Sequence, residues 1–147
     1  MTTSIIKKLV TSTPTNSTLP LRLIAGIIFS AHGAQKLFAW FGGYGLEGTG
    51  QWMDSIGLSP GYFMALGAGS AEFFGGLLLL LGLFTRASGA VLTFTMIIAI
   101  FSVHFTNGLF MSNNGYEFAL ALLGMSLALA IQGGGKYALD NIIAKNL

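Results

Sequence analysis

Ionisable side chains are rare in this chain, and several of them lie inside long apolar segments. His32 and Lys36 are four residues apart and share one face of a predicted helix. Glu72 and Glu117 lie in two other apolar segments, and His104 lies near the end of a further one. Carboxyl and imidazole groups exchange protons, and an ammonium group can hold a ligand oxygen. The pattern therefore predicts a polar site inside an otherwise apolar protein.

The side-chain types suggest separate roles within this site. Glu72 and His104 are the predicted catalytic residues, because a carboxyl and an imidazole can each gain and lose a proton. We expect the cluster to form one polar pocket that opens toward the outer side of a membrane. The residues predicted to bind a ligand there are His32, Lys36, Asn107 and Glu117.

Two interpretations of the cluster compete. In a structural one, Lys36 and the glutamates form ion pairs that fix the helix register, and the histidines bond to the backbone. In a functional one, the cluster binds a ligand or moves protons, which is the default hypothesis for ionisable groups inside a membrane. We favour the functional interpretation because register alone should not need five such residues.

A quinone-like head group suits this cluster better than haem or a metal. A haem held by two histidines needs them at matched depth, and His32 is expected to lie about two turns deeper than His104. A metal site from two His and two Glu is chemically feasible, but no HExxH spacing supports it. A quinone needs a proton-exchanging group, a donor such as Lys or Asn, and an aromatic entrance. The aromatic residues that could supply this entrance are Trp40, Tyr44, Trp52 and Phe110.

The composition indicates lipid rather than water as the solvent. Of 147 residues, 53% are hydrophobic and 8% charged, whereas a soluble domain carries roughly 25% charged residues. The seven Lys and Arg residues are scattered and form no basic patch, so nucleic acid is rejected as a partner. The absence of cysteine excludes thiolate metal sites and Fe–S clusters.

Four apolar segments each approach the ~20 residues that cross a bilayer. They run over residues 19–41, 60–83, 87–105 and 116–131. The sequence therefore predicts an all-α integral membrane protein with a four-helix transmembrane bundle in residues 19–133. Residues 1–18 and 134–147 are predicted cytoplasmic tails. Residues 42–59 are a predicted outer loop, either an amphipathic cap or a flexible connection.

The basic residues predict the orientation of the bundle. With the N-terminus in the cytoplasm, all Lys and Arg residues except Lys36 fall at cytoplasmic helix ends, so both termini are expected inside. The run from Gly133 to Lys136 is expected to close the last helix, with the lysine facing its carbonyl end, and not to bind phosphate. The residues given structural or topological roles are Arg22, Arg86, Lys136 and Asp140.

Small residues recur at helical spacing beside the two glutamates of the apolar segments. One row contains Ala65, Gly69, Glu72 and Gly76, and the other contains Glu117, Ala121, Gly124 and Ala128. Membrane helices pack closely along such rows. Both glutamates are therefore expected to point into the bundle.

Several ordered motifs together resemble the DoxX family of small bacterial membrane proteins. The resemblance covers roughly residues 21–140 and rests on motifs around His32, Glu72, Arg86, His104 and Glu117, ending at Asp140. Ala138 departs from the serine expected before the final Leu-Asp, which weakens any role for a hydroxyl there. The family's motif residues correspond to His32, Lys36, Glu72, Arg86, His104, Asn107, Glu117 and Asp140.

The resemblance implies a multi-pass protein of the bacterial inner membrane. It also implies an oxidoreductase or an accessory subunit of a quinone-linked membrane redox complex. The alternative is a non-enzymatic interaction or assembly protein that docks a partner membrane complex. The oligomeric state stays open, and a homo-oligomer is compatible with the small-residue rows.

Overall fold

The computed structural model describes residues 2–146, and within that range the chain is helical with no strand. The long helices lie close to the predicted segments, and short helices fill the predicted loop and tails. The α-helices are α1 (Thr2–Val10), α2 (Thr18–Phe38), α3 (Gly45–Ser55), α4 (Gly61–Leu81), α5 (Thr85–Ala99), α6 (Glu117–Gln132) and α7 (Asp140–Lys145). Single turns are η1 (Trp40–Gly42), the π-helical η2 (Ile100–His104), η3 (Phe105–Asn107) and η4 (Met111–Asn113).

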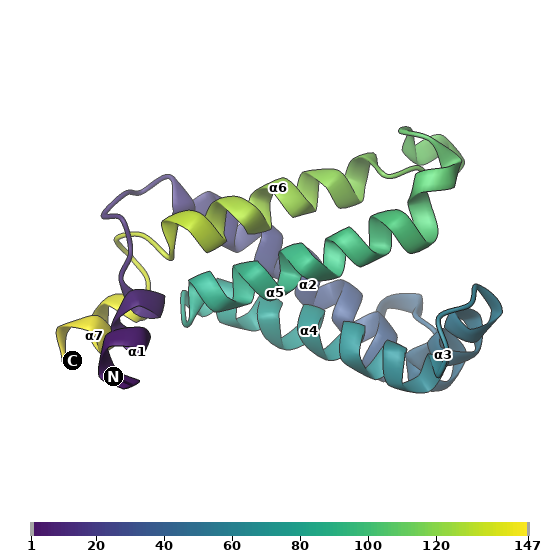
Figure 1. The fold of residues 1–147 in the computed structure, drawn as a ribbon, viewed down its shortest axis with the longest axis horizontal. Helices are drawn as coiled ribbons and strands as arrows, with labels where there is room; N and C mark the ends of the chain where they lie inside the picture. The colour runs from purple at the N-terminus through teal and green to yellow at the C-terminus, as the bar shows by residue number, and fades with distance from the viewer. Residues whose placement is uncertain (1, 147) are drawn as a thin grey trace.

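The long helices form two pairs, α2 with α4 and α5 with α6 (Figure 1). Glycines bring α2 and α4 into backbone contact. A Cβ added at Gly33 would lie 2.3 Å from the amide nitrogen of Phe73, and one at Gly76 would lie 2.6 Å from that of Ser30. Ala65, Gly69, Glu72 and Gly76 are all buried, so the predicted small-residue row of this helix is confirmed as a packing face.

The corresponding row of α6 does not face the bundle, and that prediction is wrong. Ala121 and Gly124 are exposed, and a Cβ at Gly124 would meet no atom within 4 Å. The helix instead buries Ala119, Leu122, Ser126 and Leu129. Leu122 and Leu129 supply most of the buried volume. The close contact of this helix pair is made by Gly89 of α5, whose Cβ would lie 2.7 Å from the Ser126 carbonyl oxygen.

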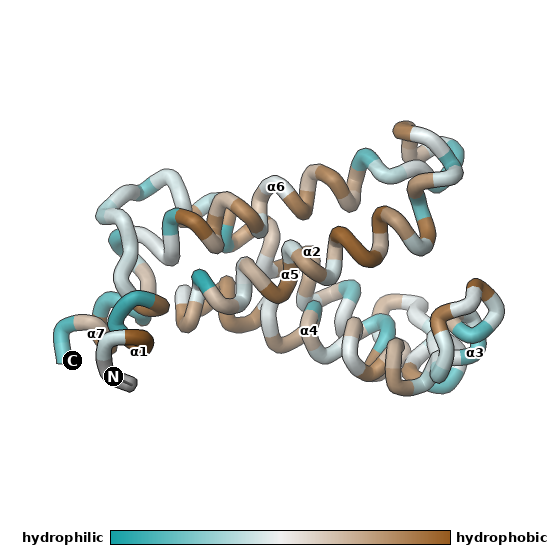
Figure 2. Tube along the Cα trace, viewed as in Figure 1, coloured by the Kyte–Doolittle hydropathy of each residue, from teal (hydrophilic) through white to brown (hydrophobic). Residues whose placement is uncertain are grey.

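Two helical stretches, Gly61–Leu81 and Thr85–Asn107, are long and apolar enough to cross a membrane. Only 33% and 22% of their apolar windows are buried inside the protein. A core helix of a soluble domain would be mostly buried, so these apolar surfaces suit contact with lipid. Figure 2 shows apolar residues along the middle of the long helices and polar ones gathered toward both ends.

At the end that holds α1, α7 and both termini (Figure 1), charged side chains form hydrogen bonds with backbone groups of distant segments. Asp140 is fully buried and accepts hydrogen bonds from the amides of Phe84 and Thr85, at 2.6 and 2.9 Å. Its carboxylate thereby caps the N-terminus of α5. Arg22 is 2% exposed and donates to the carbonyl of Gly134 at 2.9 Å.

Arg86 performs the role that the sequence suggested for Lys136. It donates to the carbonyls of Ala130, Ile131 and Gln132, the last residues of α6, and also to Thr11. These carbonyls have no partner within the helix, and a guanidinium with several donors can satisfy them together. Lys136 is exposed and lies over the ring of Tyr137, so its predicted position at the helix end is not observed.

Candidate functional site

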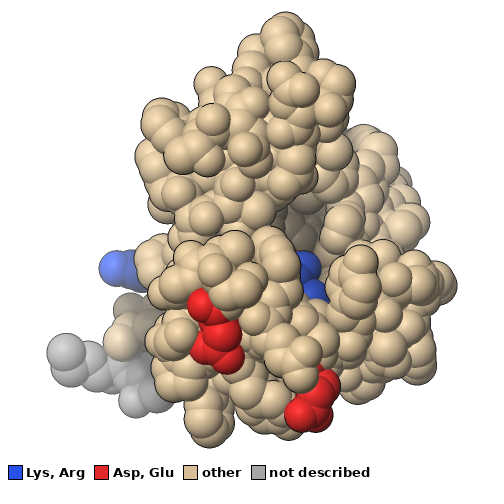
Figure 3. All heavy atoms as spheres, turned by 90° about the vertical axis from the view of Figure 1, so that its right-hand side faces the viewer, with Lys and Arg blue, Asp and Glu red and all other residues tan. Residues whose placement is uncertain are grey.

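A large cavity separates the α2–α4 pair from the α5–α6 pair at the end opposite to the termini. It encloses about 1080 Å³, and its walls come from each of the long helices together with α3 and η2. Figure 3 looks at this end of the molecule and shows a hollow with basic atoms at its bottom. Lys36 is the only lysine or arginine among the described residues that line the cavity.

Lys36 and Glu72 form an ion pair in the wall of this cavity. The distance from Nζ to Oε2 is 2.6 Å, and the two side chains are 22% and 6% exposed. Glu72 lies midway along α4, among apolar residues, where an unpaired carboxylate would be costly. The pairing of Lys36 with a glutamate matches the arrangement expected from the sequence. The ammonium group is the more accessible partner, so it can reach a ligand without leaving Glu72.

The π-helical turn η2 places His104 at the opposite wall. The Nδ1 atom of His104 lies 2.9 Å from the backbone carbonyl of Asn114. A carbonyl only accepts, so Nδ1 carries the proton of this bond and Nε2 of the neutral ring is an acceptor. Asn114 itself has a left-handed backbone, with φ of 57°, which turns its carbonyl toward the histidine.

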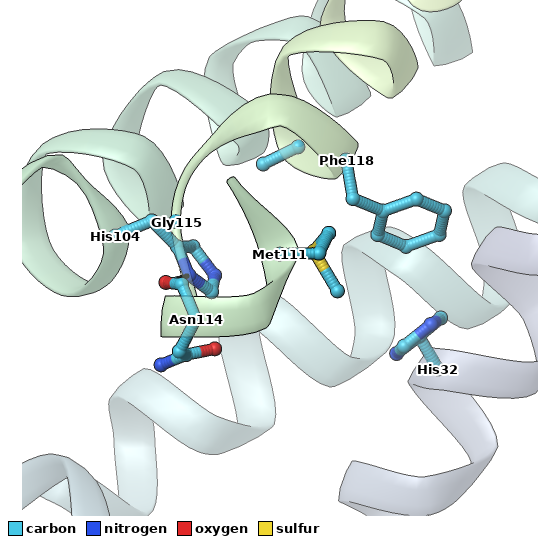
Figure 4. A pocket seen from close by; sticks show the side chains of 7 residues that line it. His32, His104, Met111, Asn114, Gly115 and Phe118 are labelled. Carbon is cyan, nitrogen blue, oxygen red and sulfur yellow. Dashed lines mark hydrogen bonds between the residues drawn. The ribbon is translucent and has the colours of Figure 1, made fainter. Parts of the chain in front are cut away.

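His32 and His104 both line a second, smaller cavity of about 370 Å³ next to the first (Figure 4). His32 is exposed, and its ring centroid lies 6.0 Å from that of Phe118. Met111 lies between the two histidines in the close view. The two histidines, expected at different depths, thus share one pocket wall.

Asn107 and Glu117 do not line either cavity. The side-chain amide of Asn107 donates to the carbonyls of Val103 and Asn114, both at 3.2 Å. Glu117 accepts a hydrogen bond from the amide of Met111 at 2.6 Å. Both side chains hold the loop between η2 and α6, and this loop carries Asn114 to His104. Their predicted contact with a ligand is not supported by this placement.

Several polar residues of the cavity were not selected from the sequence. Gln35 lies one residue before Lys36, Ser102 lies in the π turn, and Thr49 lies on α3. Each is a single polar residue without a partner at helical spacing, so the sequence did not indicate a site there. Only Gln35 could have been selected, because it lies between His32 and Lys36. Of the four aromatic residues considered as an entrance, Tyr44 and Trp52 line the cavity, and Trp40 and Phe110 line neither cavity.

The residues given structural or topological roles lie elsewhere. Arg22, Arg86, Lys136 and Asp140 are absent from both cavity walls. Within residues 2–146, no three His, Asp or Glu side chains gather closely enough to hold a metal ion. The arrangement at the cavity can donate hydrogen bonds from Lys36, accept a proton at Glu72 or His104, and enclose an apolar ring.

The fold and the cavity define a helical membrane protein with an internal polar site. The DoxX family profile matches residues 17–105, more than half of the chain. The chain belongs to the DoxX family, a family of membrane proteins, which confirms the resemblance seen in the sequence.

Curated relatives resemble the chain over most of its length. It is 40% identical to putative oxidoreductase CatD of Bacillus subtilis over 128 residues, which are 87% of each chain. It is 33% identical to inner membrane protein YqjF of Escherichia coli over 133 residues, 86% of this chain and 92% of the other. An uncharacterized protein of Haemophilus influenzae is 34% identical over 82% of this chain and 86% of its own length. No solved structure matches the chain.

Proposed function

We propose that this protein is a redox protein of the bacterial inner membrane that binds a quinone head group in the large cavity. It acts as an oxidoreductase or as an accessory subunit of a quinone-linked complex. The observation that carries the proposal is the Lys36–Glu72 ion pair, buried midway along a helix yet open to a cavity of about 1080 Å³. The names of the relatives in Bacillus subtilis and Escherichia coli support the redox role and the location.

The proposed topology has four membrane-spanning helices, α2, α4, α5 and α6, with both termini in the cytoplasm. The gathering of α1, α7 and both termini at one end supports this arrangement (Figure 1). The exposed residues Lys7, Lys8, Lys136 and Lys145 belong to that end, as the positive-inside rule expects for the cytoplasmic side. The cavity then opens on the outer side.

The cavity residues fit a quinone. Ligand pockets commonly enclose about 300–1,000 Å³, with apolar walls and few polar groups. Here aromatic and aliphatic side chains form most of the wall, and the polar groups stand at opposite sides, Lys36 with Glu72 on one and His104 on the other. A bound quinone would supply reversible two-electron, two-proton chemistry at its ring oxygens.

The protein's part in this proposal is to hold oxygens and to move protons. Lys36 donates to one ring oxygen while its charge stays balanced by Glu72. The Asn114 carbonyl fixes the imidazole of His104, so Nε2 is available to take up or release a proton at the other side. Glu72 and Lys36 both line the cavity. Glu72 can therefore exchange a proton with Lys36 or with a ligand bound in the cavity.

Quinone binding by purified protein in detergent tests this function. A fully substituted benzoquinone should quench tryptophan fluorescence, since Trp52 lines the cavity. Glu72→Gln and Lys36→Met should each weaken binding at least about tenfold, because each leaves the other group without its charged partner. The matched controls Glu47→Gln and Lys145→Met change exposed residues outside the cavity and should bind as the wild type does. Equal affinity in all these variants would contradict the proposal.

A non-enzymatic docking role is the second candidate, and one observation favours it. In the small-residue row of α6, Ala121 and Gly124 are exposed and Ala128 is half-buried, with open space at Gly124. Such rows let a second membrane helix approach closely. Native electrophoresis of Gly124→Leu would test this, because loss of a stoichiometric partner or of a homo-oligomer without loss of quinone binding supports docking.

A further inference from the structure

We propose that the cavity admits its ligand from the lipid, through an opening between α4 and α5, and that the ligand is an amphiphile with an apolar tail. This inference rests on the proposed function, and it adds the class of quinone and its route. A water-soluble ring compound would need no such opening. A membrane-resident quinone would place its ring at Lys36 and Glu72 and its tail between the two helices.

Contact between α4 and α5 ends partway along the bundle. A Cβ at Gly75 would lie 3.2 Å from Cγ of Leu92, and both residues are buried. Two helical turns before Gly75 on α4, a Cβ at Gly67 would meet no atom within 4 Å, although Gly67 lines the cavity. In Figure 1 the two helices diverge in this direction, and exposed residues of both, Gly67 and Phe94, line the cavity.

The edges of this opening are apolar and lie within the two stretches suited to cross a membrane. The α4 edge is small, formed by Gly67, Ala68 and Ala71, next to Glu72. The α5 edge carries Phe94 and Ile98, which are 63% and 41% exposed. Exposed apolar side chains at this depth face hydrocarbon, so an alkyl or isoprenoid tail would remain in apolar surroundings as it leaves the cavity.

Two other helix pairs are closed by glycine contacts. Gly33 and Gly76 close α2 against α4, where an added Cβ would come within 2.6 Å of backbone nitrogen. Gly89 closes α5 against α6 in the same way. Between α2 and α6, the ring of Phe118 stands beside His32 with centroids 6.0 Å apart. These glycine contacts close the α2–α4 and α5–α6 pairs, whereas Gly67 leaves the α4 edge open beside the cavity.

Two quinones with the same fully substituted ring test the route, one with a decyl chain and one with a methyl group. We expect the wild type to bind the decyl compound at least about tenfold more tightly, because several methylenes leave water. Gly67→Leu should reduce this preference to about threefold or less, while Gly124→Leu, also at a helical glycine with open space, should keep it. Ala68→Leu gives a second obstruction of the same edge, should the first variant fold poorly.

A single cysteine offers an independent measurement, because the chain has none. The decyl quinone should protect Gly67→Cys from a lipid-soluble maleimide, and the methyl quinone should not. If both quinones bind but neither the preference nor the protection depends on residue 67, the route is overturned and quinone binding stands. If the wild type binds neither quinone, the proposed function fails, and this inference fails with it.

Discussion

The two ends of the bundle use their charged residues in opposite ways. At the end with the termini, Arg22, Arg86 and Asp140 each bond to backbone groups of distant segments. At the other end, Lys36 and Glu72 bond to each other beside a cavity. The first arrangement satisfies helix ends that would otherwise be buried without partners. The second leaves donors and acceptors that face an open space.

This difference separates residues that hold the fold from residues that can act on a ligand. A carboxylate that accepts hydrogen bonds from two backbone amides is held in place, because moving it would leave the amides of a helix end without an acceptor. A carboxylate beside a single ammonium group can change partners with little rearrangement. Substitutions at the closed end should therefore reduce stability, and substitutions at the cavity should mainly affect binding.

Asp140→Ala should have the largest effect on stability. It removes the acceptor of the Phe84 and Thr85 amides, and we expect the free energy of unfolding to fall by about 2–4 kcal/mol. Thermal unfolding in detergent would measure this, with Glu47→Ala, an exposed acidic residue, as the control. An unchanged midpoint for Asp140→Ala would contradict the capping role.

Gly76→Leu should come next in size. Its side chain would collide with the backbone of Gly26 and Ser30, since even a Cβ would lie 2.8 and 2.6 Å from their atoms. Overpacking of this kind costs about 1–3 kcal/mol, whereas Gly124→Leu should unfold at the wild-type temperature. Equal midpoints for the two variants would show that α2 and α4 are not in close contact.

The Lys36–Glu72 pair should give a smaller, coupled effect. Lys36→Met and Glu72→Gln should each destabilise the protein, and the double variant should be more stable than the sum of the single effects predicts. We expect a coupling free energy of about 1–2 kcal/mol, because the pair is partly open to the cavity. Chemical unfolding of all four proteins measures it, and additive effects would mean that no pair forms.

Asp54 should give the smallest effect, and one that depends on pH. Hydrogen bonds from the Ser59 hydroxyl and the Gly61 amide lower the pKa of this exposed carboxyl, which lies on α3 outside the spanning helices. Its stabilising contribution is therefore full above its ordinary pKa of about 4 and is lost as the pH falls toward the lowered value. Asp54→Asn should unfold slightly earlier than the wild type at pH 7, and the difference should shrink as the pH falls below the ordinary pKa of about 4. A constant difference would argue against this origin.

Much of the fold follows from the sequence because a helix needs about 20 apolar residues to cross a bilayer. The segments of residues 60–83 and 116–131 differ from α4 and α6 by two residues or fewer at each end. The pairing of Lys36 with a glutamate could also be predicted, because a charge inside an apolar segment needs a partner. Which of the two glutamates it is came from the structure. The small residues around Glu72 correctly indicated which face of α4 is buried.

The rest depended on contacts that spacing does not encode. The two small-residue rows look alike in the sequence, yet only one is buried, since α6 packs through Leu122 and Leu129 instead. Asn107 and Glu117 resemble ligand-binding groups, but the turns before α6 bring backbone partners to them first. The widened turn at residues 100–104 has no signature in the residue types, so the direction of His104 could not be foreseen.

Because of that widened turn, the direction of the His104 side chain depends on the number of residues in the turn. A π turn holds one residue more than an α turn, and each residue of an α-helix rotates the next by about 100°. Removal of any single residue from 100–103 would let the helix relax to regular geometry and swing the imidazole away from Asn114. Chain length between α5 and the following loop, more than the identity of any one side chain there, then determines whether the imidazole of His104 stays in the cavity wall.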